Sequence, residues 1–316
     1  MQRQRNGVPA VDPAVTRSVV QTRDGQPLSY NRAPAADLAP WIARIYVIKF
    51  DVKPGHVLRC GLLNDTAFVR IMFSGQAQAE TIDGEIAFGR SALFFGPQSR
   101  RMKYSMRGNV AGVGIAIRPG ACTSLKGPRL GDYLDRIAPV EIVSPDDKAV
   151  IDTFAPDAAP EDWCRRIESL FRIRTEKMGW PVPDPVTASF EGLTLSNPAI
   201  SVKQAAAECG VDLRKLERII KRDFGLPPKQ VLRRARALDM ASYLRGVADG
   251  AESEELSLRY YDDSHFLREF AELFGMSPRQ FTETPQPLMT LALELRQARR
   301  LEFLKRLEPG KPRPWQ

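Results

Sequence analysis

Five basic side chains on one short predicted helix are the residues whose types and spacing point most clearly to chemistry. The stretch SVKQAAAECGVDLRKLERIIKRDFG, residues 201–225, predicts two helices joined by a tight turn, for which Gly210 can supply a positive φ. Asp212 is placed to cap the second helix, because its carboxylate can accept hydrogen bonds from the first backbone N–H groups. The basic residues that point outwards from this helix are Arg214, Lys215, Arg218, Lys221 and Arg222. Arginine can bind O6 and N7 of guanine, so the pattern indicates contact with the major groove of DNA.

Apolar side chains must hold these two helices together. The predicted inward face of the second helix consists of Leu213, Leu216, Ile220 and Phe224. Ala206, Gly210 and Leu216 have the relative spacing of a helix-turn-helix, in which the second helix enters the major groove.

A second copy of this unit follows in the chain. The phrase FGMSPRQF begins at Phe274, fifty residues after FGLPPKQV begins at Phe224. In the second unit, residues 254–275, the predicted inward face consists of Phe266, Phe270 and Phe274. Asp262 or Asp263 would cap its second helix. The outward candidates for DNA contact are Ser264, His265 and Arg268.

Each repeated phrase predicts the end of one helix and the start of the next. The glycine ends the first helix, Ser277 can cap the next, and Pro228 and Pro278 fit the first position of a helix. Backbone amides at such helix N-termini can bind phosphate. The predicted contacts to DNA phosphates are Lys229, Gln230 and Arg279.

The two units together resemble the DNA-binding domain of AraC/XylS-type transcription regulators. The phrases LRKLERIIKRDFGLPPKQVLRRARALDMASYL and YYDDSHFLREFAELFGMSPRQF carry this resemblance, which covers residues 183–284. It implies that a helix over residues 228–244 links two units that address successive major-groove segments. It also implies that Arg214, Lys215 and Arg218 read the first segment, and that Ser264 and Arg268 read the second. The second unit departs from the family pattern at Glu255 and Arg259, where that pattern has alanine and glycine.

Charge differs between the two units, although the whole chain has a net charge of +8. Residues 183–245 hold 11 Lys/Arg against 7 Asp/Glu, whereas residues 246–286 hold 3 against 9. Because phosphate contacts dominate DNA affinity, we expect the first unit to carry most of the binding. The second unit would adjust specificity or contact a protein partner.

The N-terminal half predicts a different fold. Short apolar runs separated by turn residues between Trp41 and Ile117 indicate strands of a small barrel or sandwich. The phrases FGPQ and GVGIAIRPGA are similar to the cupin-like sensor domains that precede AraC-type DNA-binding domains, which implies a barrel able to bind an effector. The predicted fold class is therefore a two-domain α+β chain: an N-terminal β-rich cupin-like barrel plus a linking helix, then an all-α tandem helix-turn-helix domain.

Helical segments flank the predicted DNA-binding domain. Residues 160–178 predict a helix whose apolar face would form a dimer interface or pack on the chain's own barrel. GWPVPDP, residues 179–185, predicts a domain boundary. Residues 288–308 predict a final helix that docks on the rest of the protein, because Glu302 interrupts its best heptad register. The basic tail beyond it could reach DNA phosphates, but a solvated tail is the expectation. The predicted domains are 1–182 (sensor), 183–286 (DNA binding) and 287–316 (final helix and tail).

Other classes of function have less support. A cupin-like metal enzyme needs clustered ligands, but the chain has only His56 and His265. A protein-interaction module that keeps the helix-turn-helix fold is the second alternative, which the acidic second unit favours and the basic helix 212–224 opposes. The sequence thus predicts a cytoplasmic regulator that is not an enzyme and uses no metal or other cofactor. Its expected partners are double-stranded DNA, a small-molecule effector or protein partner, a second copy in a homodimer, RNA polymerase if it is an activator, and no membrane.

Overall fold

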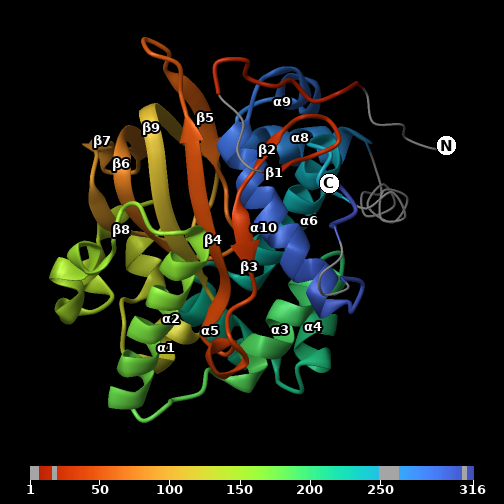
Figure 1. Cartoon of the computed structure of the whole chain (residues 1–316). Helices are drawn as coiled ribbons and strands as arrows, with labels where there is room; N and C mark the ends of the chain where they lie inside the picture. The colour runs from red at the N-terminus through yellow and green to blue at the C-terminus, as the bar shows by residue number, and fades with distance from the viewer. Residues whose placement is uncertain (1–6, 16–19, 249–262, 308–311) are drawn as a thin grey trace.

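The computed structural model describes residues 7–15, 20–248, 263–307 and 312–316 (Figure 1). Its strands are β1 (Val20–Gln21), β2 (Pro27–Leu28), β3 (Tyr30–Arg32), β4 (Ile42–Asp51), β5 (Leu58–Leu62), β6 (Phe68–Thr81), β7 (Gly84–Phe88), β8 (Ser91–Phe95), β9 (Met102–Ile117) and β10 (Ile137–Pro139). Its α-helices are α1 (Ala121–Ser124), α2 (Pro160–Lys177), α3 (Pro185–Ser196), α4 (Val202–Glu208), α5 (Leu213–Phe224), α6 (Pro228–Leu244), α8 (Asp263–Phe274), α9 (Pro278–Glu283) and α10 (Pro287–Phe303). All strands except β10 therefore precede the α-helices, and the predicted class of a β-rich N-terminal part and a helical C-terminal part is confirmed.

One sheet organises the N-terminal part. Its main strand order is β10-β8-β6-β9-β4-β3, all the pairings in it are antiparallel, and β5 and β7 join it through β9 and β6. Side chains alternate along β6, so Val69 and Ile71 point to one face while Phe68 and Met72 point to the other. The first face packs on α2, and the second packs on leucines of α10.

The helix predicted over residues 160–178 is present as α2. Pro160 occupies its first turn and Gly179, with φ +72°, follows its end. Trp163 and Ile167 are buried against the sheet. The apolar face of α2 therefore packs on the chain's own sheet, which is one of the two alternatives that the sequence left open.

The helical part contains the predicted repeated unit. In the first unit, α4 and α5 meet at Gly210, which has φ +66°. α6 leads from this unit to α8 and α9, so the two units lie at opposite ends of α6 (Figure 1). Ser277 caps α9 by accepting a hydrogen bond from the backbone N–H of Gln280, as expected. The predicted first helix of the second unit, with Glu255, Arg259 and Asp262, falls on residues that the structure does not describe.

The final helix, α10, lies between the sheet and the helical part (Figure 1). It ends at Phe303, earlier than predicted, because Lys305 adopts a positive φ of 55°. Almost every side chain from Pro287 to Leu301 is buried, which confirms that α10 docks on the rest of the protein. The tail was expected to be solvated, and this is wrong for its described end: Trp315 is buried and Arg313 pairs with Glu294. Among the described residues, no helix is long and apolar enough to cross a membrane.

Candidate nucleic-acid interface

The outward face of α5 carries four exposed basic side chains, namely those of Arg214, Lys215, Arg218 and Lys221. None of these side chains forms an ion pair or a hydrogen bond with another described residue. Most other arginines at the centre of the molecule are buried and paired, as shown below. The positive charge of α5 is therefore available to an external anion.

Local sequence explains why α5 presents this face. The carboxylate of Asp212 accepts a hydrogen bond of 2.8 Å from the backbone N–H of Lys215, which caps the helix as predicted. Leu216 and Ile220 are fully buried, and Phe224 meets Phe190 of α3 edge to face at 5.6 Å. These contacts hold the inward face, so the polar face must point to solvent. Leu213, predicted to face inward, is instead 45% exposed at the start of the helix.

Arg222 differs from the other four basic residues of α5. Its guanidinium forms ion pairs with Asp184 at 3.2 Å and Asp223 at 2.7 Å. The hydrogen bond from the Arg222 guanidinium to Asp223 is the main cause of the raised pKa of Arg222. Arg222 therefore contacts its own protein in this structure, and its role in DNA binding stays a prediction.

Asp223 connects α5 to the N-terminal part. Its carboxylate is buried and accepts hydrogen bonds from the hydroxyls of Thr123, at 2.6 Å, and Thr187, at 2.5 Å. Thr123 belongs to α1, directly after the sheet, and Thr187 belongs to α3. The C-terminal end of the predicted reading helix is thus bonded through Thr123 to the N-terminal part of the molecule.

The second unit presents α8. Arg268 is exposed and, with the offset of fifty residues, occupies the position of Arg218. Phe270 stacks on Phe274 at 4.2 Å, and both are buried, which confirms the predicted inward face. The side chains of Ser264 and His265 lie outside the described part of the structure.

The acidic residues of α8 pair with the helix that links the units. Glu269 lies 3.2 Å from Arg233 and 3.4 Å from Arg236 of α6, and Glu272 also pairs with Arg233. Glu269 is only 4% exposed. Part of the negative charge counted for the second unit is therefore neutralised inside the domain, where it fixes α8 on α6.

The three predicted phosphate contacts are all exposed. Lys229 and Gln230 lie in the first turn of α6, and Arg279 lies in the first turn of α9. Arg279 forms an ion pair with Glu283 at 2.7 Å, four residues along the same helix. Such exposed pairs are weak, so a phosphate could replace the carboxylate.

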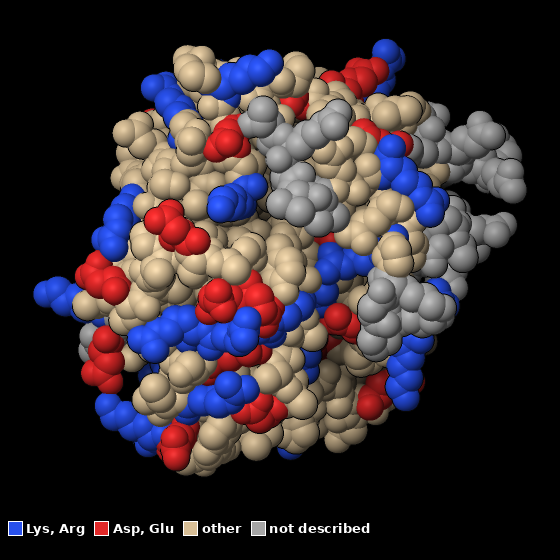
Figure 2. Space-filling model, viewed as in Figure 1, with Lys and Arg blue, Asp and Glu red and all other residues tan. Residues whose placement is uncertain are grey.

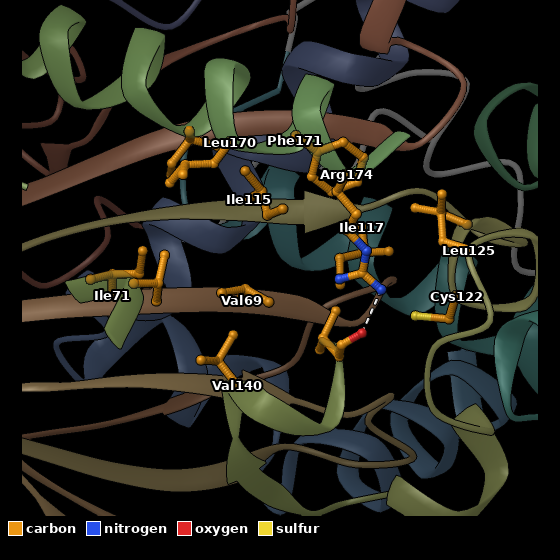
Figure 3. Close-up of a pocket in the computed structure, with 14 residues that line it drawn as sticks. Val69, Ile71, Ile115, Ile117, Cys122, Leu125, Val140, Leu170, Phe171 and Arg174 are labelled. Atoms are coloured by element: carbon orange, nitrogen blue, oxygen red, sulfur yellow. Dashed lines mark hydrogen bonds between the residues drawn. The ribbon is translucent and has the colours of Figure 1, made fainter. Parts of the chain in front are cut away.

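An apolar pocket lies between the sheet and α2 (Figure 3). Leu170, Phe171 and Arg174 of α2 approach it from one side, while strand residues such as Val69 and Ile115 form the other. Arg174 supplies a cationic group among these apolar side chains, and it donates a hydrogen bond to the carbonyl oxygen of Val143. α1 also lines this pocket through Ala121 and Cys122, immediately before Thr123.

The described residues contain no cluster of three or more side chains suited to a metal ion. His56 lies 3.0 Å from a carboxylate oxygen of Asp12, far along the chain from His265. On the face seen in Figure 2, Lys/Arg and Asp/Glu side chains are interleaved, without a broad area of one sign.

Comparison with known families decides the class of the helical part. Residues 201–284 match the family described as "Helix-turn-helix domain", whose members are of the AraC type. Residues 201–284 are an AraC-type helix-turn-helix domain. Residues 30–139 match a "Domain of unknown function (DUF6597)", which covers most of the sheet. No curated protein matches the chain in sequence. An AraC-type domain behind a β-rich domain is the organisation of a DNA-binding transcription regulator.

Solved structures to which the chain shows a weak similarity include ToxT from Vibrio cholerae O395, with 12% identity, a TM-score of 0.40, and coverage of 75% of this chain and 95% of that chain. Wild-type ToxT from Vibrio cholerae strain SCE256 with a bound unsaturated fatty acid gives 11% identity, a TM-score of 0.42, and coverage of 80% and 98%. The AraC-like transcriptional activator CuxR gives 13% identity, a TM-score of 0.28, and coverage of 72% and 88%. Likeness at this level adds nothing to the assignment of the AraC-type domain, which rests on the match over residues 201–284.

Some functional candidates in this chain carried no signal in the sequence. Thr123 and Thr187 are ordinary threonines, and their shared partner Asp223 sits at the end of a basic helix. Only the fold brings α1, α3 and α5 together. The burial of Asp223 in an otherwise amphipathic helix is the feature that could have drawn attention to it.

Proposed function

We propose that α5 is the principal DNA-reading helix of a sequence-specific transcription regulator. The observation that carries this proposal is the set of four exposed, unpaired cations on α5 of an AraC-type domain. Arg214, Lys215 and Arg218 lie on the first turns of the helix, the part that contacts base edges in helix-turn-helix proteins. Lys221 follows one turn later, and Arg222 joins these contacts only if it leaves Asp184 and Asp223.

The second unit reads the adjacent major-groove segment with fewer cations. Arg268 is its main contact, with Ser264 and His265 at the start of the same helix. Lys229, Gln230 and Arg279 bind phosphates and set the register of the two units on DNA. The ion pairs from Glu269 to α6 support this arrangement, because they hold α8 at a fixed angle to the linking helix.

Binding of a duplex operator to purified Arg218→Ala tests this assignment. We expect the Kd to rise about fivefold to tenfold, toward the low end of the range of about 1–3 kcal/mol for a bidentate arginine–guanine contact. Arg165→Ala is the matched control, since Arg165 is an exposed arginine of α2 with local acidic partners. If both variants bind as the wild type does, α5 is not the reading helix and the protein-interaction alternative gains support.

We further propose that the pocket under α2 takes an effector, an elongated apolar molecule whose acidic group meets Arg174. α1 provides the route from this pocket to DNA. Ala121 and Cys122 line the pocket, and Thr123, the next residue, donates to Asp223 on α5. A ligand that displaces α1 would therefore change the position of the reading helix.

A double-mutant cycle tests this route without a known effector. Leu170→Trp would partly fill the pocket and stand in for a ligand, and Thr123→Val keeps the side-chain shape but removes the hydroxyl. We expect Leu170→Trp to change the Kd for DNA several-fold, and expect this change to shrink in the Thr123→Val background. Thr153→Val, which removes an exposed local hydrogen bond, is the control. Strictly additive effects would contradict coupling through α1.

The remaining parts of the proposal follow from the regulator assignment. The protein acts in the cytoplasm, without enzymatic activity, metal or other cofactor. Activation would require contact with RNA polymerase, and a homodimer would place two AraC-type domains on one operator. Because the apolar face of α2 is buried in its own chain, such a dimer would use another surface.

A further inference from the structure

Two loops of the N-terminal part touch the turns that join the helices of the AraC-type domain. The first turn, residues 225–227, joins α5 to α6, and the second turn, residues 275–277, joins α8 to α9. Each turn leads into a helix N-terminus that faces a DNA phosphate in the proposed function. The two loops are residues 96–101, between β8 and β9, and residues 125–129, between α1 and the short 3₁₀ helix Leu130–Tyr133.

The first turn is enclosed by both loops. A β-carbon added to Gly225 would lie 2.9 Å from Cγ of Pro97 and 3.1 Å from the backbone of Leu130. Gly225 also has a φ of +71°, so glycine fits this position for its space and for its conformation. The side chain of Arg129, directly before Leu130, is exposed and has no ion-pair or hydrogen-bond partner among the described residues. An unpaired cation of the N-terminal part therefore lies at the edge of the first turn.

The second turn is bordered by loop 96–101. The backbone N–H of Arg101 donates a hydrogen bond of 2.7 Å to the carbonyl oxygen of Leu273, two residues before Gly275. Arg100, the preceding residue, is exposed, and its side chain pairs with nothing in the part of the chain that the structure describes. Each turn of the repeat is therefore bordered by an unpaired arginine of the N-terminal part.

A groove at the second turn carries further positive charge. It has a volume of about 320 Å³ and is lined by residues of both the turn and the sheet. Its cations are Arg59, Arg101 and Lys103, and its carboxylates are those of Glu80 and Glu85. Glu80 pairs with Lys103 at 2.9 Å, whereas Arg59 and Arg101 have no carboxylate partner within the described ranges. Three cations against two carboxylates give the groove a net positive charge, which favours a phosphate near this turn.

Hydrogen bonds fix the position of loop 96–101 against the helical part. The backbone N–H and the hydroxyl of Ser99 donate to the carboxylate of Asp135, at 2.8 and 2.5 Å, just after the 3₁₀ helix. Arg234 of α6 donates at 2.5 Å to the backbone carbonyl oxygen of Gln98, so this loop is also bonded to the helix that links the two units. Both turns are therefore bordered by one connected surface of the N-terminal part.

The distribution of charge along the chain favours a DNA contact outside the helix-turn-helix units. Residues 183–286 hold 14 Lys/Arg against 16 Asp/Glu, whereas residues 1–182 hold 25 against 19. Because phosphate contacts supply much of the affinity for DNA, a helix-turn-helix region with net negative charge gains from cations of the N-terminal part. Asp132, which is exposed three residues after Arg129, forms no ion pair with this arginine.

We propose that the N-terminal part contacts the DNA backbone directly, through Arg129 at the first turn and Arg100 at the second. Each guanidinium binds a phosphate next to the one held by the N-terminus of α6 or α9, and it reads no base because it lies outside the reading helices. This inference rests on the proposed function, since it requires DNA on the outward faces of α5 and α8. A movement of these loops would then change DNA affinity directly, without a shift of either reading helix.

The salt dependence of DNA binding by the full-length protein tests this surface. The probe is a duplex of random sequence about 30 base pairs long, which spans several helical turns of about 10 base pairs each. Each lost phosphate contact reduces the magnitude of the slope of log K against log salt by about 0.9. We expect Arg100→Ala and Arg129→Ala each to reduce it by about one and the double variant by about two. Arg129→Lys, which keeps the charge, should retain the wild-type slope, and so should Arg165→Ala, which removes an exposed arginine of α2.

Lys229→Ala in the same assay separates this inference from the proposed function. A reduced slope in Lys229→Ala, together with a wild-type slope in the Arg100→Ala/Arg129→Ala double variant, would refute the contact by the N-terminal part and leave the proposed function standing. Wild-type slopes in all of these variants, or no DNA binding by the wild type, would reject both. An equal loss in Arg165→Ala would show an effect of net charge alone, and tighter binding by the double variant would show that the loops hinder DNA; either result overturns the inference.

Discussion

Asp65 holds the interface between the sheet and the helical part, and replacing it by asparagine should destabilise the protein strongly. Its carboxylate pairs with Arg296 at 2.8 Å and Arg299 at 3.2 Å, and its backbone carbonyl accepts a hydrogen bond from Arg234 at 2.6 Å. Burial alone would raise the pKa of Asp65, but the three arginines outweigh it and lower this pKa. Asparagine keeps the shape of the side chain and removes only the charge.

The size of the effect follows from what remains after the substitution. Breaking a buried ion pair by removing one partner typically costs about 3–5 kcal/mol. Arg296 keeps Asp239 at 2.9 Å and Arg299 keeps Glu191, so neither arginine loses every carboxylate. We therefore expect a loss near the low end of that range, about 3 kcal/mol, in the free energy of unfolding.

Urea unfolding followed by tryptophan fluorescence and circular dichroism measures this loss. Asp152→Asn is the matched control, because Asp152 forms an ion pair with Arg90 in which both side chains are more than half exposed. Such exposed pairs contribute about 0–1 kcal/mol, so the control should unfold close to the wild type. Equal stability of Asp65→Asn and Asp152→Asn would refute the view that a buried charge cluster joins the two parts.

Four further predictions use the same structure. Because the folded pKa of Asp65 is lowered, its contribution to stability is present above the unfolded-state pKa of about 3.9 and is lost as the pH falls through the folded pKa. The difference in stability between wild type and Asp65→Asn should therefore stay constant from pH 7 to pH 5 and shrink in more acidic buffer. A constant difference at all pH values would show that the ionised carboxylate of Asp65 is not its cause. Burial raises the pKa values of Cys60, Cys122 and Cys164 to about 12, so at pH 8 a thiol reagent should label the partly exposed Cys209 first and the other three only on unfolding; rapid labelling of all four would contradict their burial. Arg218→Ala should reduce DNA affinity more than Arg268→Ala, because α5 carries four free cations, whereas comparable losses would show that the two units contribute equally. Lys229→Ala should weaken binding to all DNA sequences alike and reduce the slope of log K against log salt by about one, and a change confined to one sequence would show base contact instead.

The sequence allowed the architecture of the helical part to be predicted because local rules determine it. Asp212 and Ser277 are caps, Gly210 adopts a positive φ, and Pro228 and Pro278 begin helices, all as their residue types require. The order of strands and helices followed from hydrophobic periodicity in the same way. These signals depend on residues that are close together in the chain, so they can be recognised in a single sequence.

Contacts between distant segments could not be predicted in this way. One partner of Arg222 is Asp184, and two partners of Asp223 are Thr123 and Thr187; only the tertiary fold brings these residues together. The acidity of the second unit favoured a role in specificity or in contact with a protein partner, but Glu269 is buried against α6. Net charge by segment says nothing about which charges face each other.

Selection of bound duplexes from a random DNA pool tests the central claim most directly. Full-length protein should enrich a defined motif, and the double variant Arg214→Ala/Arg218→Ala should lose the bases of one half of that motif while the other half persists weakly. Recovery of the same complete motif by the double variant would show that another surface reads DNA. Failure of the wild-type protein to enrich any motif would contradict the assignment of α5 as a sequence reader in the unliganded protein.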